Sequence, residues 1–368
     1  MSNFKVEETK HVYGAKIKVI GVGGGGGNMI NHMAREGVGG VDLIAANTDA
    51  QALDISRATV KIQLGERKNR GLGSGGKPDI ARESAEESYE EIKSALEHAD
   101  IVFIAAGLGG GTGTGASPIV ARAAKEIGAL TVSITTKPFE FEGKKRMQLA
   151  ENGLNELKKE SDSIVVIPND KLLNIIDTAE GFEDSFKIVD SILCRAVSGM
   201  SGVILSRGII NVDFADVQTI MSHRGKALLG VGEGTGADAA NEAVKNAIQS
   251  PLLDDISING ALGVLVHFYA HPKNCPLRKI QEAMNIIHSA ASSEADIIFG
   301  ITADDSLENG YVRVTIVATG FDSKLIDVPE INRSETRERT IFINKRVSGG
   351  DIQEDFLDIP TIMRNPID

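Results

Sequence analysis

The chain has 368 residues, of which 42% are hydrophobic and 24% are charged, and its formal net charge is −12. This length favours two or three domains, and no uncharged apolar run approaches the ~18 residues typical of a membrane span. The acidic balance disfavours nucleic acid as a partner. The start lacks a secretory signal and two cysteines are too few for a disulfide framework, so we expect a cytoplasmic protein that does not insert into membranes.

The first half of the chain alternates short apolar segments typical of strands with segments typical of helices. This order predicts an α/β fold with a parallel, doubly wound sheet. Ligands of such sheets bind beyond the carboxyl ends of the strands. The expected strands are Lys16–Val22, Val41–Asn47, Val60–Leu64, Ile101–Ala106, Leu130–Thr135 and Ile164–Pro168, and helices are expected at Asn28–Arg35, Glu83–Glu97 and Pro118–Glu126. Glu83–Glu97 is interpreted as a helix with a solvated face.

Glycine is concentrated in three stretches, Gly21–Gly27, Gly71–Gly76 and Gly107–Gly115. The first follows an expected strand, precedes an expected helix and contains the pattern G-x-G-x-x-G, so its backbone N–H groups can hold phosphate oxygens. A dinucleotide-binding fold fits this stretch equally well. The third stretch (GLGGGTGTG) also lies between a strand and a helix, with Ser117 and Pro118 expected near the first helical turn, and the pair predicts one polyphosphate held from two sides.

No G-x-x-x-x-G-K-[ST] pattern occurs, so the chain is not a P-loop enzyme. The phosphate charge is therefore expected to be neutralised by backbone amides, helix dipoles and a magnesium ion.

The second half begins with the clearest helical pattern of the chain. Apolar residues recur at spacings of three and four from Phe182 to Val203, which predicts an amphipathic helix roughly 35 Å long. A smaller α/β domain follows, with elements expected at Ala215–His223, Ala237–Gln249, Leu262–Ala270, Pro276–Ala290, Asp296–Thr302 and Val312–Thr319. The periodicity then fails, and a mixed-charge linker leads to an apolar patch, DFLDIPTIMR, that is typical of a docking peptide.

The expected organisation is therefore a tail at 1–14, a nucleotide-binding domain at 15–181, a central helix at 182–206, a C-terminal α/β domain at 207–320, a linker at 321–354 and a terminal peptide at 355–368.

Seven motifs in this order resemble those of the FtsZ family, the tubulin-like bacterial cell-division GTPases. The resemblance runs from Lys16 to Thr319, and the terminal patch is similar to that family's adaptor-binding peptide. The motifs are GVGGGGGN, NTDAQAL, GLGSGGKP, GGGTGTG, KPFEFEGKKR, IPNDKLL and NVDFAD. The resemblance implies a tubulin-like fold, GTP hydrolysed to GDP with Mg²⁺, and self-assembly into filaments of the division ring at midcell.

The resemblance also implies a set of GTP-binding residues. Gly71–Lys77 and Ala46–Asp49 would close around the γ-phosphate and Mg²⁺, with Asp49 near an ion held mainly by the phosphates. Glu142 and Arg146 would contact the ribose and phosphates, although from the residues alone they could equally be a solvated charge cluster. The phosphates would be held by Gly24, Gly25, Gly26, Gly27, Asn28, Gly73, Gly109, Gly110, Gly111, Thr112 and Gly113.

Guanine would be recognised on the central helix, where Asp190 follows Phe186 by four residues and shares its face. Many family members have Asn at this position. A carboxylate accepts hydrogen bonds from the N1–H and amino groups of guanine and repels the N1 lone pair of adenine, so the substitution keeps a preference for guanine.

The catalytic residues implied by the resemblance are Asn211, Asp213 and Asp216, with the two carboxylates positioning the attacking water. From the sequence alone, carboxylates three apart at a helix start usually cap the helix and complement its dipole, and only the resemblance implies catalysis. If Asp190 contacts the base, the rest of the central helix places this loop roughly 25 Å away, too far to reach the nucleotide of the same subunit. Hydrolysis is then expected between subunits, in a heterologous contact that repeats into an open filament.

Two other functions remain open at this point. A nicotinamide-dependent oxidoreductase would explain Gly21, Gly23 and Gly26 but not the third glycine stretch or Asp213 and Asp216. A nucleotide-binding scaffold would bind without hydrolysis. His267 and His271 straddle the end of an expected strand and are not expected to bind a metal. The partners implied are other copies of the chain and membrane-tethering adaptors that bind Asp355–Arg364.

Overall fold

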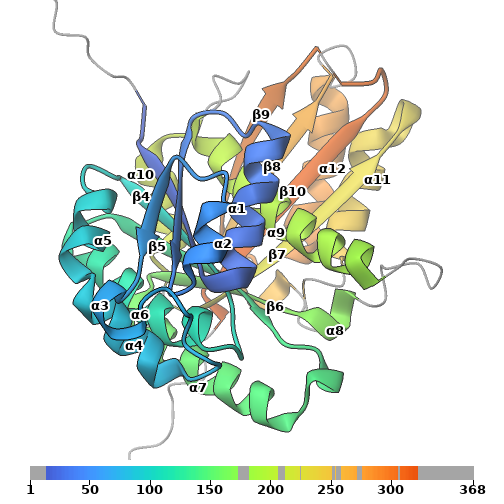
Figure 1. Ribbon diagram of the computed structural model, residues 1–368. Helices are drawn as coiled ribbons and strands as arrows, with labels where there is room; N and C mark the ends of the chain where they lie inside the picture. Colours follow the sequence, from blue (N-terminus) through green and yellow to red (C-terminus); the bar gives the residue numbers. More distant parts are fainter. Residues whose placement is uncertain are drawn as a thin grey trace, which may run out of the picture. The chain divides into compact units, whose positions relative to one another are not determined.

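A computed structural model describes residues 14–172, 182–205, 212–223, 225–250, 253, 258–271, 276–305 and 307–321, without the side chains of 182–187 and 205. Within these residues the strands form one ten-stranded sheet in the order β3-β2-β1-β4-β5-β6-β7-β10-β8-β9 (Figure 1). Apart from Gly14 and Phe321, the predicted tail, linker and terminal peptide lie outside the described residues, and the predicted domain limits stay predictions.

The six strands of the first half are all parallel, as predicted. They are β1 (Ile17–Val22), β2 (Val41–Asn47), β3 (Val60–Gln63), β4 (Ile101–Gly107), β5 (Leu130–Lys137) and β6 (Ser163–Pro168). The helices between them are α1 (Gly23–Glu36), α2 (Ala50–Asp54), α3 (Glu66–Asn69), α4 (Pro78–Glu87), α5 (Tyr89–Leu96), α6 (Thr112–Glu126), the 3₁₀ turn η1 (Glu140–Glu142), α7 (Lys144–Glu160) and α8 (Asn169–Leu172).

Both faces of this parallel sheet are buried, because successive side chains of a strand point to opposite sides. On β1, Val19 belongs to a core with Met29 and Met33 of α1, and Ile20 belongs to a second core with Ile92 of α5 and residues of α6 and α7. The sheet is therefore covered by helices on both sides, which is the predicted doubly wound arrangement.

Three helices differ from the expectation. Helix α1 begins at Gly23, so the first glycine stretch is the first helical turn and not a loop before it, and α6 begins at Thr112, which places Pro118 in the helix interior. The segment Glu83–Glu97 forms two helices that break at Ser88, whose hydroxyl accepts from Gly65 N at 3.1 Å. A side-chain bond of this kind competes with the helix. The solvated face is only one side of these helices, because Ala85, Ile92 and Leu96 are buried.

The second half forms a mixed part of the sheet. Strand β7 runs parallel to β6, whereas β10 is antiparallel to both β7 and β8, and β9 is parallel to β8. The elements are α9 (Phe182–Leu205), α10 (Phe214–Met221), β7 (Gly225–Gly234), the 3₁₀ turn η2 (Gly236–Asp238), α11 (Ala239–Ile248), the 3₁₀ turn η4 (Ile258–Gly260), β8 (Gly263–Ala270), α12 (Leu277–Ala290), β9 (Asp296–Ala303) and β10 (Val312–Thr319). Strand β7 was not predicted, because glycines at alternate positions weaken its strand pattern.

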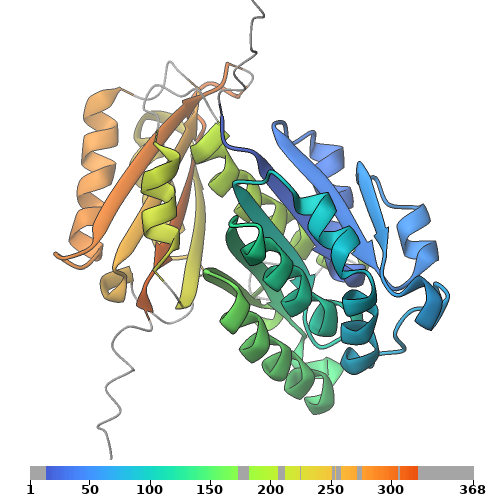
Figure 2. The ribbon, with the colours of Figure 1, turned by 90° about the vertical axis from the view of Figure 1, so that its left-hand side faces the viewer.

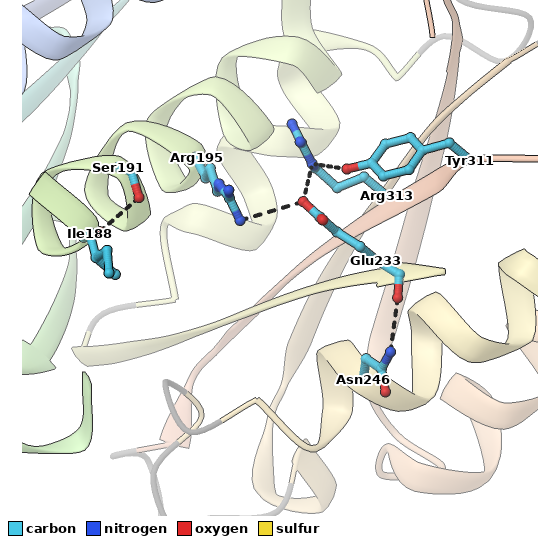
Figure 3. A network of polar contacts seen from close by, with 7 residues as sticks. All are labelled: Ile188, Ser191, Arg195, Glu233, Asn246, Tyr311 and Arg313. Carbon is cyan, nitrogen blue, oxygen red and sulfur yellow. Dashed lines mark hydrogen bonds and ion pairs between the residues drawn. The ribbon is translucent and has the colours of Figure 1, made fainter. Parts of the chain in front are cut away.

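The central helix α9 packs between the two halves (Figure 2). Its Leu193, Val197 and Met200 share one core with β4 and β5 and with Leu229 and Leu265 of the second half. Polar contacts add to this packing, as Figure 3 shows.

Glu233 of β7 lies at the centre of those contacts. Its Oε1 is 3.4 Å from Arg195 Nη1 of α9 and 3.0 Å from Arg313 Nε of β10. These ion pairs are partly exposed, so the apolar contacts hold the helix more than the charges do. Among the described helices, α9 included, none is both long and apolar enough to cross a membrane.

Candidate functional site

The two predicted phosphate-binding stretches meet at the carboxyl ends of β1 and β4. A Cβ built on Gly23 would lie 2.8 Å from Gly113 N, so the first turns of α1 and α6 are in direct contact. Neither helix has a side chain that caps its first N–H groups. Free N–H groups and the positive ends of two helix dipoles therefore converge, which is the arrangement that binds an anion.

The glycines of this region fall into two groups. Some are required by packing: a Cβ on Gly26 would lie 2.3 Å from Ala105 O, and one on Gly113 would lie 2.3 Å from Gly107 O. Gly111 makes a similar contact, 2.9 Å from Lys77 N, and Gly109 has a φ of +95°. The nearest contact at Gly25 is 3.3 Å, which a small shift could relieve.

Three other glycines face open space. Gly24, Gly27 and Gly110 have no atom within 4 Å of a built Cβ, and none has a φ in the left-handed region. Gly73 is also open, but its φ of +81° by itself favours glycine. Since the chain does not need glycine at the first three positions, close approach of a ligand to the backbone is the remaining physical reason for it. The residues therefore fit a polyphosphate.

Two further segments contact the start of α6. The hydroxyl of Thr112 lies 2.7 Å from Thr48 Oγ1 and 3.2 Å from Ser74 Oγ, which joins the start of α6 to the segments after β2 and before α4. Asp49 Oδ1 accepts from Gln51 N at 2.9 Å and so caps α2. No cluster of three metal-ligating side chains occurs among the described residues.

Glu142 and Arg146 lie beside the third glycine stretch, Gly107–Gly115, and form an ion pair with each other. Glu142 Oε1 also accepts from Phe139 N at 2.9 Å, and a Cβ on Gly109 would lie 3.0 Å from Arg146 O. Arg146 follows two lysines in the first turn of α7, which has no acidic residue. Because cations are unfavourable at a helix N-terminus, a bound anion would stabilise this turn.

The predicted base-binding residues lie on α9. Burial raises the pKa of Asp190 to about 6, against the opposing effect of the Arg35 charge. Hydrogen-bond donors from a ligand would stabilise the ionised form of this half-buried carboxylate. Asn28 is exposed on the first turns of α1, which packs against α9. Phe186 belongs to α9, but its side chain is not described.

The predicted catalytic carboxylates lie at the other end of the sheet. Asp213 is the N-cap residue of α10 but its side chain makes no capping hydrogen bond, and both it and Asp216 are exposed. Val217 and Met221 of α10 line a small apolar void with Ile101 and Leu130, the first residues of β4 and β5. Strand β4 is about 20 Å long, so the carboxylates and the phosphate-binding stretches are well separated. Asn211 lies outside the described residues.

Sequence reasoning did not single out three polar residues of this region: Thr48 and Ser74, which lie inside the predicted segments Ala46–Asp49 and Gly71–Lys77, and Asn169. Asn169 directly follows β6, is 7% exposed, and its buried Oδ1 has no hydrogen-bond partner among the residues that the structure describes. Its position at the carboxyl end of a parallel strand could have marked it.

A cavity lies elsewhere among the described residues, between the C-terminal end of α1, α9 and the strands β8, β9 and β10. It has a volume of about 810 Å³ and does not touch the glycine stretches. His267, which lines it, is 6% exposed and has Nε2 2.8 Å from Thr302 Oγ1, and burial lowers its pKa to about 4. This histidine is held as a neutral core residue.

Comparisons with known proteins agree with this geometry. The GTPase domain of the Tubulin/FtsZ family matches residues 16–177, and the C-terminal domain of the FtsZ family matches residues 225–322. The chain is 47% identical to the cell division protein FtsZ of Helicobacter pylori strain 26695 and 45% identical to that of strain J99, in each case over 95% of this chain and 92% of the relative.

Solved structures give the same result. An empty FtsZ dimer from M. jannaschii is 47% identical, with a TM-score of 0.79 over 84% of this chain and 89% of that chain. CetZ2 from Haloferax volcanii, solved as a GTPγS-bound protofilament, is 22% identical with a TM-score of 0.71 over 90% of this chain and 99% of that chain, and supports the fold alone. The oxidoreductase and the non-hydrolysing scaffold are thereby set aside, and the chain belongs to the FtsZ family of tubulin-like, polymerising cell-division GTPases.

Proposed function

We propose that subunits of this GTPase join head to tail, and that the GTP of one subunit is hydrolysed with the help of Asp213 and Asp216 of the next. The observation that carries the proposal is the position of α10 at the amino ends of β4 and β5, whereas the glycine stretches follow the carboxyl ends of β1 and β4. Carboxylates at one end and nucleotide at the other can meet only between two molecules. Such a contact is heterologous and repeats into an open filament.

The state of Asp213 supports this assignment. A residue kept only to cap α10 would accept a hydrogen bond from the first helical turn, and the carboxylate of Asp213 accepts none there. Its exposed carboxylate is thus available to polarise a water in a neighbouring site. Asn211 and Asp216 would complete that group of residues.

The exposed apolar side chains near the nucleotide also support a subunit contact. Leu72 is 80% exposed in the segment Gly71–Lys77, and Phe141 is 66% exposed in η1 beside Glu142. Large apolar side chains on both sides of a binding site are typical of a surface that becomes buried in a complex.

Within one subunit, we assign the phosphates to the amides of Gly24, Gly27 and Gly110 and to the start of α6. Glu142 would bind the ribose, Arg146 the phosphates and Asp190 the guanine base. Mg²⁺ would be coordinated mainly by phosphate oxygens, near Asp49, and would neutralise their charge.

The terminal segment Asp355–Arg364 lies outside the described residues, and its role as a docking peptide for membrane-tethering adaptors stays a prediction. The location of the filaments in the cytoplasm at midcell also stays a prediction.

The test of catalysis between subunits uses two damaged proteins. Asp213→Ala should bind GTP and form long-lived filaments but release phosphate at least about a hundredfold more slowly, the usual minimum effect of losing a catalytic base. Gly110→Asp should not hold GTP. When the two are mixed, phosphate release should exceed the sum of the separate rates, since an intact site can receive Asp213 from the other variant.

Glu294→Ala serves as the charge control, because Glu294 is an exposed acidic residue in the turn before β9. It should keep the wild-type rate. A wild-type rate for Asp213→Ala, or turnover per wild-type subunit that does not depend on protein concentration, would show that each subunit hydrolyses its own GTP.

A further inference from the structure

Thr114 lies in the first turn of α6, and the two branches of its side chain have different partners. The residue is 3% exposed, and its hydroxyl accepts from Gly109 N at 2.9 Å. Its methyl group packs on α7, where a Cβ on Gly153 would lie 2.4 Å from Thr114 Cγ2. A β-branched side chain in a helix has few χ1 rotamers, so the two contacts hold it in one orientation. Thr114 therefore joins the third glycine stretch, α6 and α7 through one fixed side chain.

The bond to Thr114 decides where the N–H of Gly109 points. On one side of Gly109, Leu108 N donates to a β5 carbonyl at 2.9 Å, and on the other side the Gly111 carbonyl accepts from an α6 N–H at 2.9 Å. Between these two anchors, the described residues provide one hydrogen bond, from Gly109 N to the Thr114 hydroxyl. This bond turns the Gly109 N–H into the protein, so that amide is not available to a ligand, and Gly110, which faces open space, follows it.

Gly109 also touches the helix that carries Arg146. A Cβ on Gly109 would lie 3.0 Å from Arg146 O and 3.1 Å from Pro138 Cγ. A shift of Gly109 therefore changes both the course of the chain into Gly110 and its contact with the first turn of α7. Gly109 is buried, and a buried N–H is costly to leave unpaired. Loss of the Thr114 hydroxyl thus favours such a shift.

We propose that Thr114 is a positioning residue of the phosphate site and acts through Gly109 on the amide of Gly110. Its hydroxyl sets the direction of the chain at Gly109 for the phosphates of GTP. Its methyl group contributes to the packing of α6 on α7 and not to nucleotide binding. This inference rests on the proposed phosphate site and adds to it a buried residue that does not itself contact the nucleotide.

The test separates the two branches in variants of the full chain with Mg²⁺, diluted until the protein stays monomeric. Thr114→Val keeps the shape of the side chain and removes the hydroxyl. Its affinity for GTP, measured by calorimetry, should fall about fivefold, as expected for one lost hydrogen bond.

Thr114→Ser is the conservative variant, which keeps the hydroxyl and removes the methyl group. Its midpoint of urea unfolding should fall below that of the wild type because a packed methyl group is lost, while its GTP affinity stays within about twofold. In assembling conditions, KM for GTP should rise in Thr114→Val only, and kcat for phosphate release should stay within about twofold of the wild type in both variants.

Thr131→Val is the matched control. Thr131 is fully buried near the start of β5, at the end of the strand away from the glycine stretches, and its hydroxyl donates to Ala129 O at 3.1 Å. The change removes a buried hydroxyl in the same way. It should lower the midpoint of urea unfolding, since Ala129 O loses a donor, and leave GTP affinity unchanged.

Three outcomes would overturn the inference. Wild-type GTP affinity in Thr114→Val would show that the hydroxyl does not position the glycine stretch. An equal loss of affinity in Thr114→Ser, or a loss in Thr131→Val, would show that affinity follows stability and not this hydroxyl. If Gly110→Asp bound GTP normally, the proposed phosphate site itself would be wrong, whereas the first two results leave that site intact.

Discussion

Glycine has opposite uses in the two halves of the sheet. In β7, a Cβ on Gly232 would lie 2.1 Å from Ala243 O of α11, and Gly230 and Gly234 make equally close contacts with the same helix. These glycines let a helix lie directly on a strand. At the starts of α1 and α6, Gly24, Gly27 and Gly110 touch nothing within 4 Å of a built Cβ.

The difference shows that a glycine-rich motif by itself does not indicate a binding site. Substitution of a glycine that packing requires should lower the free energy of unfolding. Substitution of a glycine that faces open space at the site should weaken ligand binding. The two groups can be separated by measuring both quantities on the same variants.

The largest effect is expected for Gly110→Asp. The position has room for a side chain, so the free energy of unfolding should stay near that of the wild type. The new carboxylate would lie beside the phosphates, where unit charges 4 Å apart near a protein surface repel by on the order of 4 kcal/mol. GTP affinity, measured by calorimetry, should fall more than about a hundredfold.

Gly39→Asp is the control for that change, because Gly39 also faces open space but follows the far end of α1. It should bind GTP as the wild type does. Normal GTP affinity in Gly110→Asp would mean that the open space at Gly110 is not a phosphate site.

A smaller effect, on stability alone, is expected for Gly232→Ala. The added methyl group meets backbone atoms of α11, so the helix must move away from β7, at a cost of about 2–3 kcal/mol in the free energy of unfolding. Urea denaturation of the full chain should show the loss, and GTP affinity measured at low urea should stay unchanged. If Gly232→Ala bound the nucleotide more weakly but kept the wild-type stability, the division of the glycines into packing and ligand-binding groups would be wrong.

The smallest effect concerns Asp190 and depends on pH. Because burial raises its pKa to about 6, the carboxylate is ionised only above that pH, and guanine donates hydrogen bonds to the ionised form. GTP affinity should therefore fall about tenfold between pH 7 and pH 5. Asp190→Asn keeps a hydrogen-bond acceptor that does not titrate. Dividing the GTP affinity of the wild type by that of Asp190→Asn at each pH removes the effect of GTP ionisation, because both proteins bind the same nucleotide.

The raised pKa of Asp190 changes protein stability with pH in the opposite direction to GTP affinity. The nucleotide-free protein binds the Asp190 proton more tightly than the unfolded chain does, so the free energy of unfolding falls as the pH rises towards about 6. Asp190→Asn should lack this decline. Identical stability profiles for the two proteins would show that folding does not raise the pKa of Asp190.

Much of the fold could be predicted from residue patterns. Strands β2 and β10 have the predicted limits residue for residue, because their apolar runs are bounded by turn residues. Strand β7 could not be predicted, because three of its last five residues are glycines that contact α11, and glycine is not typical of strands. Helix α7 was also missed, because only Ala150, Gly153, Leu154 and Leu157 of its 17 residues are buried.

The site was predictable only in part. The glycine stretches and the carboxylates could be found as motifs, but the motif does not show which glycines face open space, since that depends on contacts such as Gly26 with Ala105. The hydroxyls of Thr48 and Thr112 are 64 positions apart, and only the parallel order of β2, β1 and β4 brings them together. Local sequence carries no sign of this contact.

The order of the strands also has a consequence for synthesis of the chain. Strands β1 to β6 lie within residues 17–168, and in the described sheet they pair with later strands at three residues only, Ser163–Val165 of β6 with β7. The parallel sheet and the helices α4 to α7 on one face can therefore form while the ribosome is still making α9. Phe103 and Val132 on the other face stay only partly covered until α9 emerges. For that interval the unfinished chain exposes an apolar surface that a chaperone can bind.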